Sequence, residues 1–150
     1  MNKEEYQEII NNAIQLEIDA ANFYRGLQEQ VKNDSSKVLL KELENMEWGH
    51  KHILEHLDVE GIENYQTLNI PDLKISESLL DPADNSYMSI QDVLATAIKR
   101  EEEAMKLYTR LADETEENRI KNLFVRLADE EAKHKLQLET IYDTEILYEN

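Results

Sequence analysis

The sequence predicts an all-α protein that forms one domain. Its 150 residues include only three Gly and two Pro, so residues that break helices are scarce. Apolar residues recur at intervals of three and four along four stretches of the chain, which is the spacing of one helix face. A chain of this length can bury a sizeable core. We therefore expect a single four-helix domain over residues 1–150.

Four helices are predicted, with ends that are uncertain by several residues. Their expected ranges are 3–30, 36–58, 90–112 and 116–142. Polar residues that can accept hydrogen bonds from the first helical turn precede or begin each range. These capping residues are Asn2 with Glu5, Ser35, Ser89 with Asp92, and Thr115. Short links at 31–35 and 113–115 then pair the helices into two antiparallel hairpins.

A long crossover is predicted between the two hairpins. Residues 59–88 contain Gly61, Pro71 and Pro82 and have no sustained apolar periodicity. A connection of this length can run the full height of a bundle, as in ferritin-like bundles. A flexible linker between two independent hairpins is the alternative, but a lone helical hairpin buries little apolar surface.

The charge balance and the absence of cysteine exclude several classes of function. The chain has 33 acidic and 16 basic residues, a net charge of −17, which repels phosphate backbones and anionic lipids. We expect no nucleic-acid or membrane partner. Without cysteine there are no disulfides, thiolate metal sites or cysteine nucleophiles. The start MNKEEYQEII lacks the apolar core of a signal peptide, so we expect a cytoplasmic protein.

Each predicted helix has an apolar face that is interrupted at its middle by ionisable residues. The interrupting residues are Glu17 on the first helix, Glu47 and His50 on the second, Glu101 on the third, and Glu131 and His134 on the fourth. The two halves of the chain repeat at an offset of 84 residues, which relates Glu17 to Glu101 and His50 to His134. The sequence thus predicts a pseudo-twofold bundle with these six side chains at its centre.

Such a cluster indicates a metal site, because a buried carboxylate without a partner costs several kcal/mol. Two divalent cations would balance four carboxylates, while the imidazoles bind as neutral donors. Glu-x-x-His occurs twice, as EWGH at 47–50 and EAKH at 131–134, and residues three apart can reach one metal from adjacent turns. We expect two metal ions, and these donors suit iron and manganese alike. A misjudged register that leaves the four glutamates in solvent is the competing interpretation.

The repeated pattern of Glu-x-x-Ala with a tyrosine one turn further on, then Glu-x-x-His, resembles the rubrerythrin branch of the ferritin-like superfamily over nearly the whole chain. The resemblance implies a diiron centre whose reduced form is oxidised by peroxide or dioxygen, with the same six residues as ligands. Glu47 and Glu131 would bridge the metals, and Glu17 and Glu101 would be terminal ligands. It also implies a homodimer.

Two features differ from rubrerythrins. Those proteins add a rubredoxin domain with an iron-tetracysteine site, whereas this chain has no cysteine, so we expect a separate donor protein or reductant to supply electrons. They also carry an extra glutamate where this chain has Ala104, so the six ligands form a symmetric set, as in bacterioferritin. We expect a peroxide-reducing oxidoreductase that protects against oxidants. The alternatives are a ferroxidase for iron storage or delivery, and a non-enzymatic metal carrier or interaction bundle.

Residues near the six ligands have two open interpretations. Tyr24 and Tyr108 lie seven residues beyond the terminal glutamates, where they either pack in the core or donate hydrogen bonds to ligand carboxylates. Ala20 and Ala104 either leave space for an oxidant or allow close helix packing. Five other residues are expected to face away from the site: His52, His56, Glu102, Glu103 and Glu130.

Overall fold

The computed structural model describes residues 3–57 and 89–149. The helices in these ranges are α1 (Lys3–Gln28), α2 (Asp34–Glu55), α4 (Ile90–Glu114) and α5 (Asn118–Glu149). The same ranges contain no β-strand, so the predicted all-α class is confirmed. The expected crossover and the cap at Asn2 lie outside the described residues. No helix in the described ranges is both long and apolar enough to cross a membrane.

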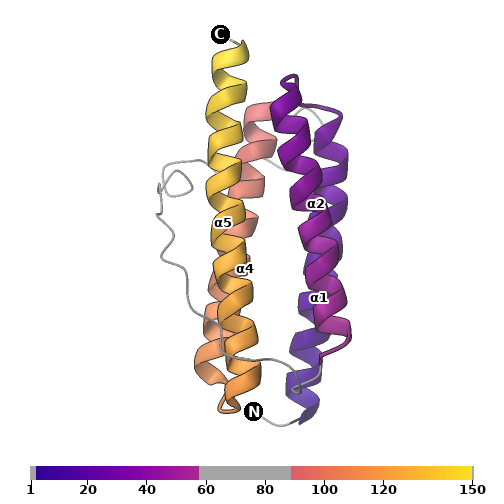
Figure 1. Ribbon diagram of the computed structural model, residues 1–150, viewed down its shortest axis with the longest axis vertical. Coiled ribbons are helices and arrows are strands. Elements are labelled where there is room, and N and C mark those ends of the chain that lie inside the picture. The colour runs from indigo at the N-terminus through magenta and orange to yellow at the C-terminus, as the bar shows by residue number, and fades with distance from the viewer. Residues whose placement is uncertain (1–2, 58–88, 150) are drawn as a thin grey trace.

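The helices form two antiparallel hairpins, α1 with α2 and α4 with α5, which stand side by side in Figure 1. Helices α1 and α5 run in one direction along the bundle, and α2 and α4 run in the other. Helix α2 therefore ends at the opposite end of the bundle from the start of α4. This order of directions is that of a ferritin-like bundle, as predicted.

The core consists of two apolar clusters, each built from all four helices. The cluster at the α1–α2 turn includes Tyr24, Leu40, Leu94 and Leu138. The cluster at the other end includes Ile10, Leu54, Tyr108 and Phe124. All of these side chains belong to the helix faces that apolar spacing predicted. Between the two clusters lies a layer of buried charged residues.

The N-terminus of α2 is capped by a different residue from the one predicted. The side chain of Asn33 accepts hydrogen bonds from the backbone N–H of Ser35 at 2.8 Å and of Ser36 at 3.3 Å. Ser35 lies inside the first turn, so its prediction as the cap is wrong. Asn and Ser are both good capping residues, and the spacing alone did not distinguish them.

The two later helices give one correct cap and one wrong one. The side chain of Ser89 accepts from the backbone N–H of Asp92 at 3.2 Å, so the predicted cap of α4 is confirmed. Thr115 instead ends α4, so its prediction as the cap of α5 is wrong. Glu117 takes that role, because its carboxylate accepts from the backbone N–H of Ile120 at 3.0 Å.

Helix α5 continues to Glu149, well beyond the predicted end at residue 142. The buried side chain of Glu145 accepts hydrogen bonds from the backbone N–H groups of Lys32 at 3.2 Å and Asn33 at 3.1 Å. Ile146 packs against the apolar cluster at the same end of the bundle. These tertiary contacts hold the last turns of α5 against the α1–α2 turn.

Replacement of Glu145 by Ala should destabilise the α1–α2 turn, because it leaves two backbone donors without their acceptor. We expect the free energy of unfolding to fall by about 1–3 kcal/mol, measured by chemical denaturation. Asp143→Ala is the matched control, since Asp143 is an exposed acidic residue on the same helix. Equal stability of the two variants would show that Glu145 does not hold this turn.

Candidate metal centre

The six residues predicted as ligands meet in the charged layer between the two apolar clusters. Glu17 comes from α1 and Glu101 from α4, while α2 and α5 each supply a glutamate and a histidine. Each of the six residues is at most 2% exposed. Misjudged registers would have left the glutamates in solvent, so that competing interpretation is wrong.

The donor atoms of these residues form two overlapping groups. The first group is Glu17, Glu47, His50 and Glu131, and the second is Glu47, Glu101, Glu131 and His134. Within each group, the donor atoms all lie within 4.8 Å of one another. Glu47 and Glu131 belong to both groups. Two carboxylates shared between two donor sets is the geometry that a pair of bridged metal ions requires.

Both imidazoles present the same nitrogen to the carboxylates. The Nδ1 atom of His50 lies 2.8 Å from Oε1 of Glu131, and Nδ1 of His134 lies 2.6 Å from Oε1 of Glu47. The two rings are stacked, with their centroids 5.6 Å apart and an angle of 10° between their planes. The arrangement repeats the pseudo-twofold relation between the two hairpins.

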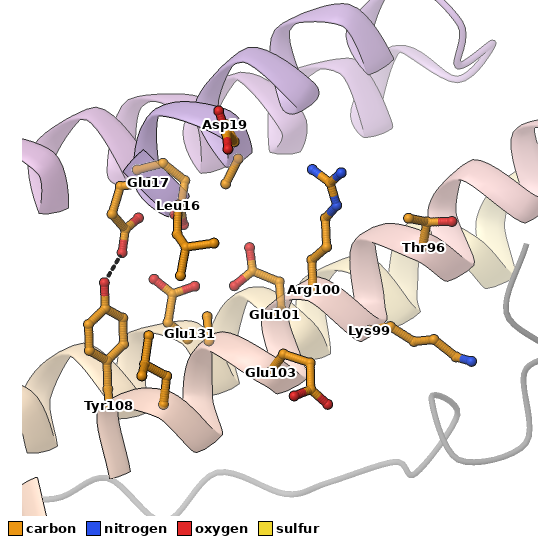
Figure 2. Close-up of a pocket in the computed structure, with 14 residues that line it drawn as sticks. Leu16, Glu17, Asp19, Thr96, Lys99, Arg100, Glu101, Glu103, Tyr108 and Glu131 are labelled. Atoms are coloured by element: carbon orange, nitrogen blue, oxygen red, sulfur yellow. Dashed lines mark hydrogen bonds between the residues drawn. The ribbon is translucent and has the colours of Figure 1, made fainter. Parts of the chain in front are cut away.

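Among the buried carboxylate oxygens of this layer, Oε2 of Glu17 and Oε2 of Glu101 lack a hydrogen-bond partner within the described ranges. An unsatisfied buried polar atom is rare and costs about 1–3 kcal/mol. Figure 2 shows the carboxyl groups of Glu17, Glu101 and Glu131 directed toward the space between the hairpins. Cations in that space would supply the missing partners, and oxygen and nitrogen donors without sulfur fit iron or manganese.

Tyr24 and Tyr108 join the terminal carboxylates across the two hairpins. The hydroxyl of Tyr24 donates to Glu101, and that of Tyr108 donates to Glu17 at 2.5 Å (Figure 2). Burial and the neighbouring carboxylates raise the pKa of both tyrosines well above its ordinary value. Both hydroxyls therefore stay protonated as donors. Their rings belong to the apolar clusters, so each tyrosine has both of the arrangements that the sequence left open.

A cleft of about 580 Å³ between α1 and α4 reaches the carboxylates (Figure 2). Its lining includes the four glutamates of the two donor groups together with Ala20 and Ala104. A second cleft of about 570 Å³ between α2 and α5 is lined by both imidazoles and by none of those four glutamates. The centre can thus be approached from two sides that differ in chemistry.

The sequence profile of the Rubrerythrin family matches residues 8–79 and 92–148. The chain belongs to the rubrerythrin family. A solved structure of a hypothetical protein from Pyrococcus furiosus is similar to this rubrerythrin-family chain, with a TM-score of 0.71 and 26% sequence identity. That match covers 95% of this chain and 90% of the other. No curated protein sequence matches significantly.

Glu130 contacts the site of this rubrerythrin-family chain, so the prediction that it faces away is wrong. Its carboxylate accepts a hydrogen bond from Nε2 of His50 and lies 3.3 Å from the guanidinium of Arg126. Successive helical residues are about 100° apart, which suggested a different face from that of Glu131. The long side chain of Glu130 nevertheless reaches the imidazole. A metal-ligating histidine usually needs a hydrogen-bond partner for its second ring nitrogen. That requirement could have indicated Glu130 as the partner of His50.

His52, His56 and Glu103 are exposed, as predicted. Glu102 lies 3.9 Å from Nζ of Lys135 and belongs to neither donor group.

Without metal, the cluster in this rubrerythrin-family chain retains protons near neutral pH. Burial and the charges of Glu131 and Glu101 raise the pKa of Glu47 well above its usual value. Burial, followed by the charge of Glu131, raises the pKa of Glu101 to about 8. Burial alone would lower the pKa of His134, but its contacts with Glu101 and Glu131 raise it to about 10. Metal binding must therefore displace protons.

The metal-free protein should lose stability as pH rises from about 6 to about 8.5. The pKa of Glu101 is about 8 when folded against an ordinary value of 4.5, so the folded state binds more protons than the unfolded state between these values. The raised pKa of His134 acts in the same direction above its ordinary value of 6.5. Calorimetric melting of chelator-treated protein checks this, and Glu101→Gln should flatten the dependence. A melting temperature that rises over this pH range would contradict the prediction.

Proposed function

We propose that this chain holds two iron ions between four glutamates and two histidines, and that it reduces hydrogen peroxide or dioxygen as a diiron oxidoreductase. The observation that carries the proposal is the pair of overlapping donor groups that share Glu47 and Glu131. Membership of the rubrerythrin family supports iron as the metal. Manganese is the alternative, because the same donors suit both metals.

The residues are assigned roles by their membership of the two groups. Glu47 and Glu131, which belong to both groups, would be shared by the two metals, while Glu17 and His50 would hold one and Glu101 and His134 the other. The hydroxyls of Tyr24 and Tyr108 fix the orientation of the terminal carboxylates through their hydrogen bonds, as partners of ligands do in other metal sites.

The reaction needs two electrons and two protons for each hydrogen peroxide that is converted to two water molecules. Two ferrous ions held by the six residues would supply these two electrons. The α1–α4 cleft gives a small oxidant access from the side of the carboxylates, where Ala20 and Ala104 leave space. The apolar clusters above and below the charged layer exclude water from its two ends.

Turnover requires partners that supply electrons. Because the 150 residues contain no cysteine, the donor is proposed to be a separate protein or a small reductant. The chain is further proposed to act in the cytoplasm as a homodimer and to protect the cell from oxidants.

A ferroxidase for iron storage or delivery is the second candidate. One observation favours it: Ala104 lies one turn beyond Glu101 and lines the cleft, so the six ligands form a symmetric set without the extra glutamate of other rubrerythrins. In that case dioxygen is the oxidant, and ferrous iron is the substrate rather than a resident cofactor. Metal content alone does not distinguish the two candidates, whereas oxidant preference and iron retention do.

Replacing a bridging glutamate should lower metal occupancy at both positions. We expect wild-type protein to bind two irons per chain after anaerobic reconstitution, and Glu47→Ala or Glu131→Ala to bind one or fewer, measured by elemental analysis after desalting. Glu103→Ala is the control, because Glu103 is exposed and pairs only with Lys106 among the described residues. Full two-metal loading in both bridge variants would contradict their assignment.

Diferrous protein should be oxidised by hydrogen peroxide faster than by dioxygen, and it should need an external reductant for each further turnover. Stopped-flow absorption with each oxidant measures the two rates, and iron analysis under excess ferrous salt measures retention. Faster oxidation by dioxygen together with retention far above two irons per chain would favour the storage ferroxidase. Two stable irons that neither oxidant oxidises would favour a metal carrier, and no bound iron would favour an interaction bundle.

A further inference from the structure

We propose that the two metal subsites differ in affinity, and that the subsite of Glu17 and His50 binds its metal more tightly than the subsite of Glu101 and His134. Glu130 is inferred to be the positioning residue that causes the difference. The inference rests on the proposed dimetal centre, and it goes beyond that centre because the six ligands alone are symmetric.

The first observation is the support that His50 receives on its outer side. Its Nε2–H group donates to the carboxylate of Glu130, and Glu130 is itself held by Arg126 at 3.3 Å. In the metal-free protein Nδ1–H donates to Glu131 at 2.8 Å, and once a metal displaces that proton, the Nε2–H group held by Glu130 leaves the lone pair on Nδ1 for the metal. The ring of His50 is thus fixed in the tautomer and orientation that a metal requires.

The second observation is that His134 has no such support. The repeat offset of 84 residues relates Glu130 on α5 to Met46 on α2, and a thioether is only a weak acceptor. Within the described ranges, Nε2 of His134 is buried and makes no hydrogen bond. Both Met46 and His134 line the α2–α5 cleft. The ring of His134 therefore lacks the contact that selects one tautomer of His50.

The two halves also differ in the residue that holds the partner of the histidine. Arg126, which holds Glu130, corresponds at the same offset to Glu42. An acidic side chain at position 42 cannot orient a neighbouring carboxylate as the cationic Arg126 orients Glu130. The ligands of the two subsites are therefore related by the repeat, whereas the residues that support the two histidines are not.

Loss of a hydrogen-bond partner of a metal-bound histidine lowers metal affinity about 10–100-fold. We therefore expect two binding steps that differ by about this factor, with the first ion entering the His50 subsite. The ion at the His134 subsite would then be the exchangeable one. A centre loaded in this order can hold one ion while the second arrives or leaves.

Anaerobic titration with Co²⁺, followed by calorimetry and by visible absorption, measures the two steps without any catalytic turnover. Wild-type protein should show one tight and one weaker site. His134→Ala should keep the tight step and lose the weaker one, and His50→Ala should do the opposite. This pair of variants assigns each step to its subsite.

The role of Glu130 is tested by removing its carboxylate, which should weaken one binding step, and by adding a carboxylate near His134, which should strengthen the other. Glu130→Ala should weaken the tight step about 10–100-fold and leave the weaker step unchanged, while Glu130→Gln, which keeps an acceptor oxygen, should restore part of the loss. Met46→Glu should strengthen the weaker step, because it places an acceptor near Nε2 of His134. Glu103→Ala is the control for the loss of one exposed negative charge, and melting curves show whether each variant is folded.

Each measurement has a result that would contradict one part of the proposal. Two equal Co²⁺ sites in wild-type protein would overturn the inequivalence and leave the dimetal centre intact. A Glu130→Ala variant that weakens both steps alike, or that matches Glu103→Ala, would overturn the role of Glu130. An unchanged weaker step in a folded Met46→Glu variant would overturn the explanation for His134. Absence of Co²⁺ binding would overturn the proposed function together with this inference.

Discussion

The burial of a charged layer inside the bundle is the constraint on which the rest of the structure depends. Its contacts join the two hairpins, since Tyr24 reaches Glu101 and His50 reaches Glu131 across the bundle. Apolar clusters above and below exclude water from the layer. This raises the free-energy cost of each buried polar atom that has no partner. Metal binding and the association of the two hairpins are therefore coupled, because the same side chains serve both.

Helical spacing was enough to predict the fold class and the six clustered residues. Steps of three and four identify which face of a helix is buried, and a carboxylate in the middle of such a face, such as Glu17, needs an explanation that only a partner provides. Spacing could not predict where long side chains on neighbouring faces end. Glu130 contacts His50 on another helix. Glu44 is buried and forms an ion pair at 2.9 Å with Arg25, which is also on another helix.

Helix ends were the least predictable local feature, for a related physical reason. Several polar residues near one end can each cap it, as Asn33 and Ser35 illustrate, and small differences in backbone direction decide between them. The long extension of α5 depends on Glu145, which binds backbone groups of a turn more than 100 residues away in sequence. Local propensity contains no information about such a contact.

The open side of the centre follows from the number of ligands on each helix. On α2 and α5, the residue three positions after the first ligand is a histidine, and those imidazoles line the α2–α5 cleft. On α1 and α4, the same position holds Ala20 and Ala104, which line the cleft that reaches the carboxylates. A methyl group occupies much less space than an imidazole ring. The helices that supply one ligand each therefore leave a cleft against the buried carboxylates, and the helices that supply two present imidazole on the other side.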